Sequence, residues 1–116
     1  MPAFTAQAPA KIILFGEHAV VYGRPAIAVP VMALQARAIV RAEPRAPHGK
    51  VRLIAPAIRL EALLEELGAE HPLRRVVELT AQELGAAYLP ACQIQIQSTI
   101  PVASGLGSGA AVSVAI

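Results

Sequence analysis

The segment that most constrains the fold of this chain is a glycine-rich turn followed directly by small residues, Ile100 to Ile116 (IPVASGLGSGAAVSVAI). Its glycines Gly105, Gly107 and Gly109 allow a tight backbone turn that points successive N–H groups into one concavity. A helix is predicted to follow at once, over Ala110 to Ile116. The unpaired N–H groups and positive dipole end of such a helix favour a phosphate group. A glycine turn that merely leads into a buried helix would give the same pattern.

A second segment, APAKIILFGEHAVVYGRPAIAV, lies near the N-terminus. The short apolar run Ile12 to Phe15 ends at Gly16, which is typical of a buried strand. Lys11 precedes this run, and an adjacent acid and imidazole, Glu17 and His18, follow it. A lysine beside a strand, an acid–imidazole pair and a distant phosphate-type loop suit phosphoryl transfer, which needs positive charge and positioning more than covalent chemistry.

Both segments resemble the GHMP small-molecule kinases, the family of galactokinases, homoserine kinases, mevalonate kinases and phosphomevalonate kinases. The stretch PAKIILFGEHAVVYGRPAIAV is most similar to the mevalonate kinases, because galactokinases usually have a DY pair where this chain continues with Ala19 to Gly23. The run PVASGLGSGAA is similar to the family's phosphate loop, PxxxGLGSSAA. The resemblance covers essentially the whole chain, and the first motif is the more specific of the two.

The resemblance implies an α+β fold, namely the N-terminal domain of the GHMP kinases, which is similar to the ribosomal protein S5 domain 2-like fold. Residues 1–116 would form part of that domain, and the C-terminal domain is not in this sequence. The implied reaction transfers the γ-phosphoryl group of ATP, with Mg²⁺, to the small-molecule substrate mevalonate, giving 5-phosphomevalonate for isoprenoid synthesis. The resemblance is also compatible with a homodimer of the full-length enzyme.

The resemblance also implies roles for individual residues. Lys11 matches the family's lysine near the γ-phosphate and the reacting hydroxyl, where a cation would neutralise transition-state charge. Glu17 and His18 match the pair at the substrate end, where His18 would donate to the mevalonate carboxylate. The loop expected to wrap the ATP phosphates consists of Ala103, Ser104, Gly105, Leu106, Gly107, Ser108 and Gly109. The plainer interpretations are a strand-edge lysine with its head in water and a turn pair that satisfies local backbone groups.

Two departures from the family pattern stand out. Gly109 replaces the second serine of the loop, which commonly helps to hold Mg²⁺ in mevalonate kinases, so this position supplies no oxygen ligand. The family's catalytic aspartate, metal-binding glutamate and third glycine-rich motif all lie beyond the matched stretch. Because a hydroxyl nucleophile needs positioning and usually a base, we expect the 116-residue chain to be inactive alone and poorly soluble.

Other functions remain open at this stage. Gly105-x-Gly107-x-x-Ala110 formally matches the dinucleotide fingerprint of dehydrogenases, although it follows a strand that alternates with glutamine. A Walker-type loop is excluded because the sequence has no Gly-Lys-Ser or Gly-Lys-Thr. Another GHMP kinase, notably a phosphomevalonate kinase, and a non-catalytic remnant that still binds phosphate are the remaining alternatives.

Composition narrows the partners and the compartment. The net charge is only +2 and the basic residues are scattered, which argues against nucleic acid and anionic membranes. Gln93, Gln95 and Gln97 interrupt the uncharged C-terminal third, so a membrane span is rejected. One cysteine and no secretory signal favour the cytoplasm. No arrangement of His, Cys and acids has metal-ligand spacing. The apolar end of the sequence, without a helix cap, predicts a truncation inside a helix.

The remaining pattern predicts strands first, then helices, then strand–loop–helix, which indicates a mixed sheet with helices on one face. Strands are expected at residues 3–7 and 11–15, pairing with each other, and at residues 26–31, 34–42, 51–54 and 94–100. Helical spacing of leucines predicts one helix over residues 60–67, and a second is expected to begin at Pro72 and continue to Ala87. Arg74 and Arg75 are assigned to the polar side of that helix, His48 and His71 to solvated loops, and Cys92 to the core.

Overall fold

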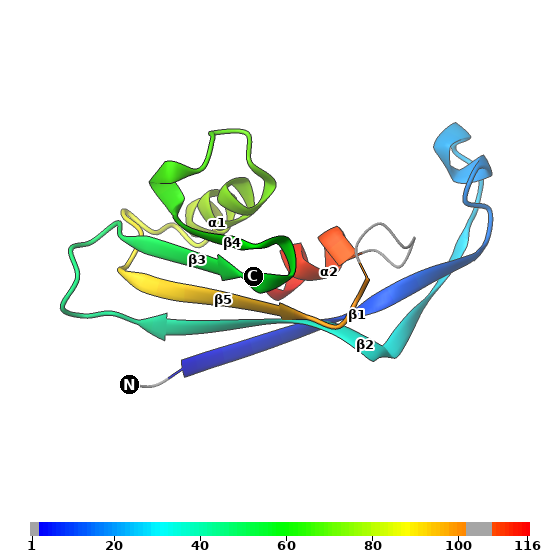
Figure 1. Cartoon of the computed structure of the whole chain (residues 1–116). Helices are drawn as coiled ribbons and strands as arrows, with labels where there is room; N and C mark the ends of the chain where they lie inside the picture. The colour runs from blue at the N-terminus through cyan, green and yellow to red at the C-terminus, as the bar shows by residue number, and fades with distance from the viewer. Residues whose placement is uncertain (1–2, 102–107) are drawn as a thin grey trace.

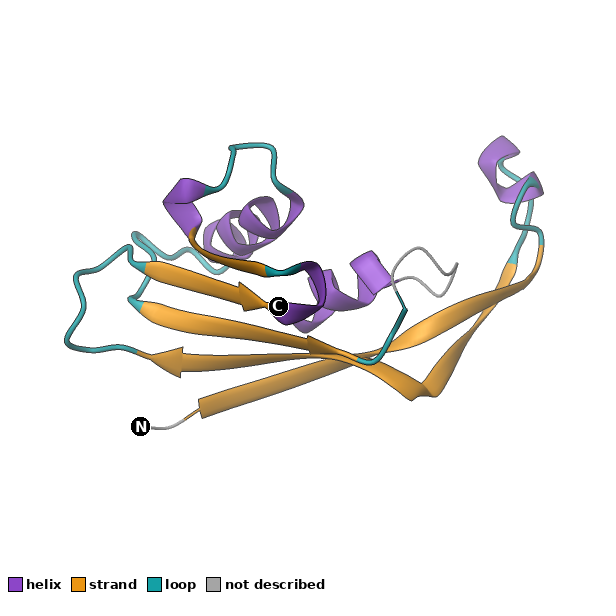
Figure 2. Cartoon of the chain, viewed as in Figure 1, coloured by secondary structure: helices purple, strands orange, loops and turns teal. Residues whose placement is uncertain are grey.

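The fold of the computed structural model, which describes residues 3–101 and 108–116, is one mixed five-stranded sheet with helices on one face. The sheet order is β1-β2-β5-β3-β4, with only β3 and β5 parallel. Figure 2 shows both α-helices on the same side of the strands. The bounds of the strands and α-helices are β1 Ala3–Phe15, β2 Ile27–Ala42, β3 Val51–Ala55, β4 Leu60–Leu63, α1 Pro72–Glu83, β5 Cys92–Ser98 and α2 Ser108–Ala115. The expected α+β class, with a mixed sheet covered on one face, is confirmed.

The core lies between the sheet and the two helices and has two parts. In the larger part, Leu73 and Val77 of α1 pack over Leu53 of β3 and over Ile94 and Ile96 of β5. The isoleucines of β5 alternate with more exposed glutamines, as the sequence predicts for a strand with one buried face. Cys92 belongs to this part and is 7% exposed, which confirms its assignment to the core.

The smaller part of the core is made almost entirely of alanine. Helix α2 packs against β1 and β2, and its buried contacts are Ala111 and Ala115. The facing residues come from the two strands and from the segment after β5, and they are Ala8, Ala10, Ala36, Ala38 and Ile100. Because alanine carries only a methyl group, the helix backbone comes close to the strands here. This packing places the start of α2 next to the strand that carries Lys11.

Strands β1 and β2 continue beyond the rest of the sheet as a two-stranded arm. Strand β1 pairs with β2, and only Ala36 to Ala42 of β2 pair with β5 as well. From Lys11 onward, β1 and its partner segment of β2 therefore have no third strand beside them in the described part of the chain. The register shifts between Pro9 and Ala10, where β2 contributes three extra residues. Figure 1 shows the arm reaching away from the helices to the short helix η1, Ala19–Tyr22.

Several expectations about the strands are wrong. The segments at residues 3–7 and 11–15 do not pair with each other; they are one continuous strand, β1, paired with β2. The run Ile12 to Phe15 forms a strand but is not buried, since Leu14 is 51% and Phe15 72% exposed. The arm carries this run past the helices, so nothing among the described residues covers it.

The prediction of a helix over residues 60–67 is also wrong. The segment forms β4 and the single turn η3, Leu64–Glu66, because Leu60 to Leu63 pair with β3. The second helix begins at Pro72 as expected, but it ends at Glu83 rather than Ala87. Gly85 has φ +71°, and the amide of Ala86 donates to the carbonyl of Ala81, which closes the helix. Leu84 is therefore 79% exposed instead of lying on the helix's apolar face.

Candidate functional site

The phosphate end of the expected site lies where α2 begins. Ser108 and Gly109 are the first two residues of this helix, whose leading N–H groups have no partner one turn earlier in the helix. Residues Ala103 to Gly107 of the expected loop lie outside the described residues. A Cβ placed on Gly109 would meet no described atom within 4 Å, so packing among the described residues does not require a glycine there.

Lys11 lies on β1, one residue after Ala10, which is 0% exposed and packs in the alanine core beneath α2. Its own side chain is half-buried. Lys11 therefore follows the last β1 residue of the alanine core, at the point where the arm begins. The fold brings together the elements that carry Lys11 and Ser108, although they are far apart in the sequence.

The substrate end of the expected site lies at the tip of the arm. Gly16 turns the chain with φ +89°, and a Cβ there would come within 2.5 Å of the carbonyl oxygen of Pro25. The amide of Val20 donates to the carbonyl of Gly16 at 2.9 Å and closes the turn that holds Glu17 and His18. Only glycine fits this position, which explains why a glycine precedes the acid–imidazole pair.

Glu17 and His18 lie in solvent. Their side chains are 65% and 98% exposed, and His18 Nε2 lies 3.9 Å from Glu17 Oε1. An ion pair this exposed contributes little to stability. Along an extended strand, the four residues from Lys11 to Phe15 span about 13 Å. The described residues therefore place the strand of Lys11 against α2 but leave the acid–imidazole pair on the projecting tip, apart from Lys11.

A cavity that the sequence does not predict adjoins the start of α2. It measures about 340 Å³ and is lined mainly by apolar atoms. The residues around it come from the end of β3, η2 (Pro56–Ile58), the start of α1, the end of β5 and the first turns of α2. Ser108 and Gly109 form part of its wall, so the cavity opens beside the expected phosphate loop.

His71 also lines this cavity, and its surroundings contradict the assignment to a solvated loop. The residue is half-buried, and its Nδ1 accepts a hydrogen bond of 3.2 Å from the amide of Leu73. His71 is thus the N-cap of α1, directly before Pro72 in the first turn. The sequence reasoning missed this role, although a histidine immediately before the proline that opens a helix is a signal that could have indicated it. His48, the other histidine assigned to a solvated loop, is exposed and packs on Tyr88 with ring centroids 4.6 Å apart.

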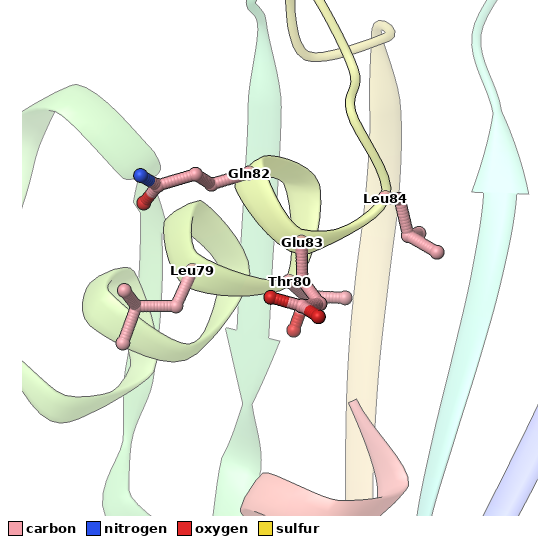
Figure 3. A pocket seen from close by; sticks show the side chains of 5 residues that line it. All are labelled: Leu79, Thr80, Gln82, Glu83 and Leu84. Carbon is pink, nitrogen blue, oxygen red and sulfur yellow. The ribbon is translucent and has the colours of Figure 1, made fainter.

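A hollow at the C-terminal end of α1 is lined by Leu79, Thr80, Gln82, Glu83 and Leu84. Figure 3 shows these side chains pointing in different directions, with one carboxylate among them, so they form no binding cluster. Within residues 3–101 and 108–116, no group of three or more His, Cys, Asp or Glu could hold a metal ion. No helix in the described part of the chain has the length and hydropathy to cross a membrane.

Comparisons with known proteins agree with the sequence motifs. A family described as "GHMP kinases N terminal domain" matches residues 71–116. The mevalonate kinase of Thermococcus sibiricus is 39% identical over 125 residues, covering 95% of this chain and 36% of the relative. That of Archaeoglobus fulgidus is 40% identical over 111 residues, covering 95% of this chain and 34% of the relative. The chain therefore spans about a third of the length of these curated relatives.

Solved structures give the same result at the level of the fold. The crystal structure of the Methanococcus jannaschii mevalonate kinase superposes with a TM-score of 0.79 at 27% identity, covering 98% of this chain and 38% of that one. The Lactococcus lactis galactokinase complexed with galactose superposes with a TM-score of 0.70 at 22% identity, covering 96% and 30%. The dinucleotide alternative fits this fold poorly, because β5 pairs antiparallel with β2 instead of lying within a parallel sheet.

Proposed function

Because this chain belongs to the GHMP kinase family, we propose that it is the N-terminal part of a kinase that phosphorylates mevalonate. The reaction moves the γ-phosphoryl group of ATP to the primary hydroxyl of mevalonate and gives 5-phosphomevalonate and ADP. The observation that carries the proposal is the similarity to mevalonate kinases along 95% of the chain, including the strand with Lys11 and the helix that begins at Ser108.

The described residues fit a bound ATP. The amides and hydroxyl at the start of α2 would hold the phosphates, since a helix N-terminus attracts anions. The cavity of about 340 Å³ beside Ser108 would take the nucleoside. Lys11, on the strand beneath α2, would neutralise charge on the transferred group. We assign no step to Mg²⁺, because the described residues by themselves form no metal site.

Glu17 and His18 would bind the substrate at the tip of the arm. His18 would donate a hydrogen bond to the mevalonate carboxylate, and Glu17 would orient His18 or accept from a substrate hydroxyl. Both side chains are exposed, so a productive site requires protein from outside this chain to bring substrate and phosphates together. The 116-residue chain alone is accordingly expected to lack mevalonate-dependent turnover.

A chimera tests this function directly. In it, residues 1–116 replace the matching N-terminal third of the Thermococcus sibiricus mevalonate kinase, and ADP release is measured with and without mevalonate. We expect mevalonate-dependent turnover in the chimera and none from the 116-residue chain. Lys11→Met should lower kcat by at least about 100-fold, which is typical of removing one electrostatic contact to a transition state. Lys50→Met is the control, since Lys50 precedes β3 and pairs with Glu65 of η3 at 2.8 Å, outside the arm and outside α2.

The chimera also separates the alternatives. Turnover with phosphomevalonate instead of mevalonate would assign the chain to another GHMP kinase. ATP binding without turnover of either mevalonate or phosphomevalonate would favour a non-catalytic, phosphate-binding protein. A well-folded chimera that neither binds nor hydrolyses ATP would contradict the proposal.

A further inference from the structure

The cavity beside α2 joins an apolar space to an anion-binding helix end. Its walls include Ala57 and Ile58 on one side and Ile96, Ile100 and Val112 on the other. Ser108 and Gly109, the first residues of α2, line the same space. A ligand that fits both features has a flat apolar ring and, attached to it, a phosphate group. A nucleoside triphosphate has that chemistry, and this assignment rests on the function proposed above.

The volume limits which part of the nucleotide the cavity takes. Pockets for small ligands measure about 300–1,000 Å³. A cavity of about 340 Å³ lies at the lower end of that range, so it suits a base with its sugar and leaves the triphosphate outside. The phosphates then meet the start of α2, where the first N–H groups have no acceptor within the helix itself.

His71 is the imidazole in the wall of this cavity, and the fold determines which of its nitrogens carries the hydrogen. Nδ1 accepts from the amide of Leu73 at 3.2 Å, so Nδ1 holds no hydrogen. In the neutral ring the hydrogen therefore sits on Nε2, which makes Nε2–H a donor. The cap thus fixes the ring at the start of α1, where His71 lines the cavity, and leaves Nε2–H as the remaining donor of the ring.

We propose that His71 fixes the purine ring of the nucleotide in this cavity by donating a hydrogen bond from Nε2. Purine rings suit this donor because their unsubstituted ring nitrogens are acceptors at the edge of a flat apolar surface. The serine hydroxyls of the wall can donate or accept, so they distinguish bases less strictly than His71 does. His71 is a binding residue that selects the base, and it takes no part in the transfer of the phosphoryl group.

The test compares ATP with inorganic tripolyphosphate, which has the phosphates and no base. Binding of each to the chimera described above is measured by calorimetric titration, together with the thermal midpoint of each variant of the chimera. His71→Asn retains an N-cap acceptor but loses the Nε2–H donor. Ala57→Leu narrows the cavity at an exposed position, so it should leave the fold intact. His48→Asn, at the other histidine in a loop, is the matched control.

We expect His71→Asn to weaken ATP binding about three- to tenfold, the range that one neutral hydrogen bond supplies, and to leave tripolyphosphate binding unchanged. Ala57→Leu should likewise weaken ATP alone, and His48→Asn should change neither ligand. The role of His71 would be overturned if His71→Asn lost affinity equally for both ligands. It would also be overturned if His71→Asn left ATP binding and the thermal midpoint unchanged. Either result would leave the kinase proposal in place. If the unsubstituted chimera binds neither ATP nor tripolyphosphate, the proposed function itself fails.

Discussion

At the scale of single residues, two glycines in the arm distinguish the cost of an unusual backbone conformation from the cost of a steric clash. Gly16 and Gly23 have similar φ values of +89° and +78°, a region that costs a residue with a Cβ about 1–2 kcal/mol. A Cβ at Gly16 would also come within 2.5 Å of the Pro25 carbonyl oxygen, whereas at Gly23 it meets nothing within 4 Å. The turn that presents Glu17 and His18 therefore depends more strongly on Gly16.

The first prediction concerns these two glycines. Gly16→Ala should open the turn at the arm tip, while Gly23→Ala should incur only the backbone cost. Amide exchange of Val20, whose N–H donates to the carbonyl of Gly16, is the measurement. We expect faster exchange in Gly16→Ala than in Gly23→Ala. Equal exchange rates in the two variants would show that the contact with Pro25 does not matter.

The second prediction concerns Cys92 and pH. Burial, followed by the charge of Glu43, raises the pKa of the Cys92 thiol above its ordinary value of 9.0. The thiol therefore ionises more easily in the unfolded chain than in the folded one. Its contribution to stability is present below the unfolded pKa and is lost as the pH rises through the folded pKa.

Urea unfolding near pH 7 and near pH 10 measures this effect. The unsubstituted chain should lose more unfolding free energy between the two pH values than Cys92→Val does, because valine fills the site without titrating. Other groups that titrate in this range are the same in both proteins, so they cancel in the comparison. The same loss in both proteins would refute the assignment to Cys92.

At the scale of elements, the contact between α2 and the first two strands depends on small side chains. Ala10 is 0% exposed beneath α2, while Ala6 of the same strand is exposed. Inserting larger side chains into a packed core commonly costs about 1–3 kcal/mol. The position of α2, and with it the separation of Ser108 from Lys11, is therefore set by alanines.

We expect Ala10→Leu to lower the free energy of unfolding by about 1–3 kcal/mol and Ala6→Leu to change it by less than about 0.5 kcal/mol. Urea titration followed by circular dichroism measures both variants. In the chimera, Ala10→Leu should also reduce turnover, because it moves the strand of Lys11 relative to α2. Comparable stabilities for the two variants would mean that α2 does not pack on β1 as described.

At the scale of the whole molecule, the chain is elongated. Its radius of gyration is 15.8 Å, whereas a compact chain of this length has about 13 Å. The arm accounts for the extension, and large apolar side chains on it are exposed. We call these the arm surface: Ile12, Leu14, Phe15, Val20, Val21, Tyr22, Ile27 and Met32. An apolar surface of this kind promotes association in water.

The purified 116-residue chain should therefore self-associate at micromolar concentration, as its expected poor solubility implies. Phe15→Lys combined with Tyr22→Lys should shift light scattering toward the monomer. Leu79→Lys with Leu84→Lys is the matched control, because both leucines are exposed outside the arm, at 51% and 79%. Association that persists in the arm variant, or that disappears equally in the control, would contradict a role for the arm surface.

The sequence by itself determined the elements that local chemistry specifies. Pro72 marks the start of α1, the glutamine alternation marks β5, and the small residues after the glycine turn mark α2. The motifs also determined the family and named Lys11, Glu17, His18 and the loop as candidates, whose roles remain predictions. These signals are local because a cap, an alternation or a motif needs no distant partner.

Only the tertiary structure decided what depends on a distant partner. Leucines over residues 60–67 fit helical spacing, yet pairing with β3 makes the first half a strand, because the backbone hydrogen bonds there come from another segment. Likewise, an apolar run predicts a strand but not whether anything covers it, so Ile12 to Phe15 proved exposed. The cavity with His71 combines residues from five elements, and no single stretch of sequence specifies it. Pairing and burial are relations between segments, and the chain must fold before they exist.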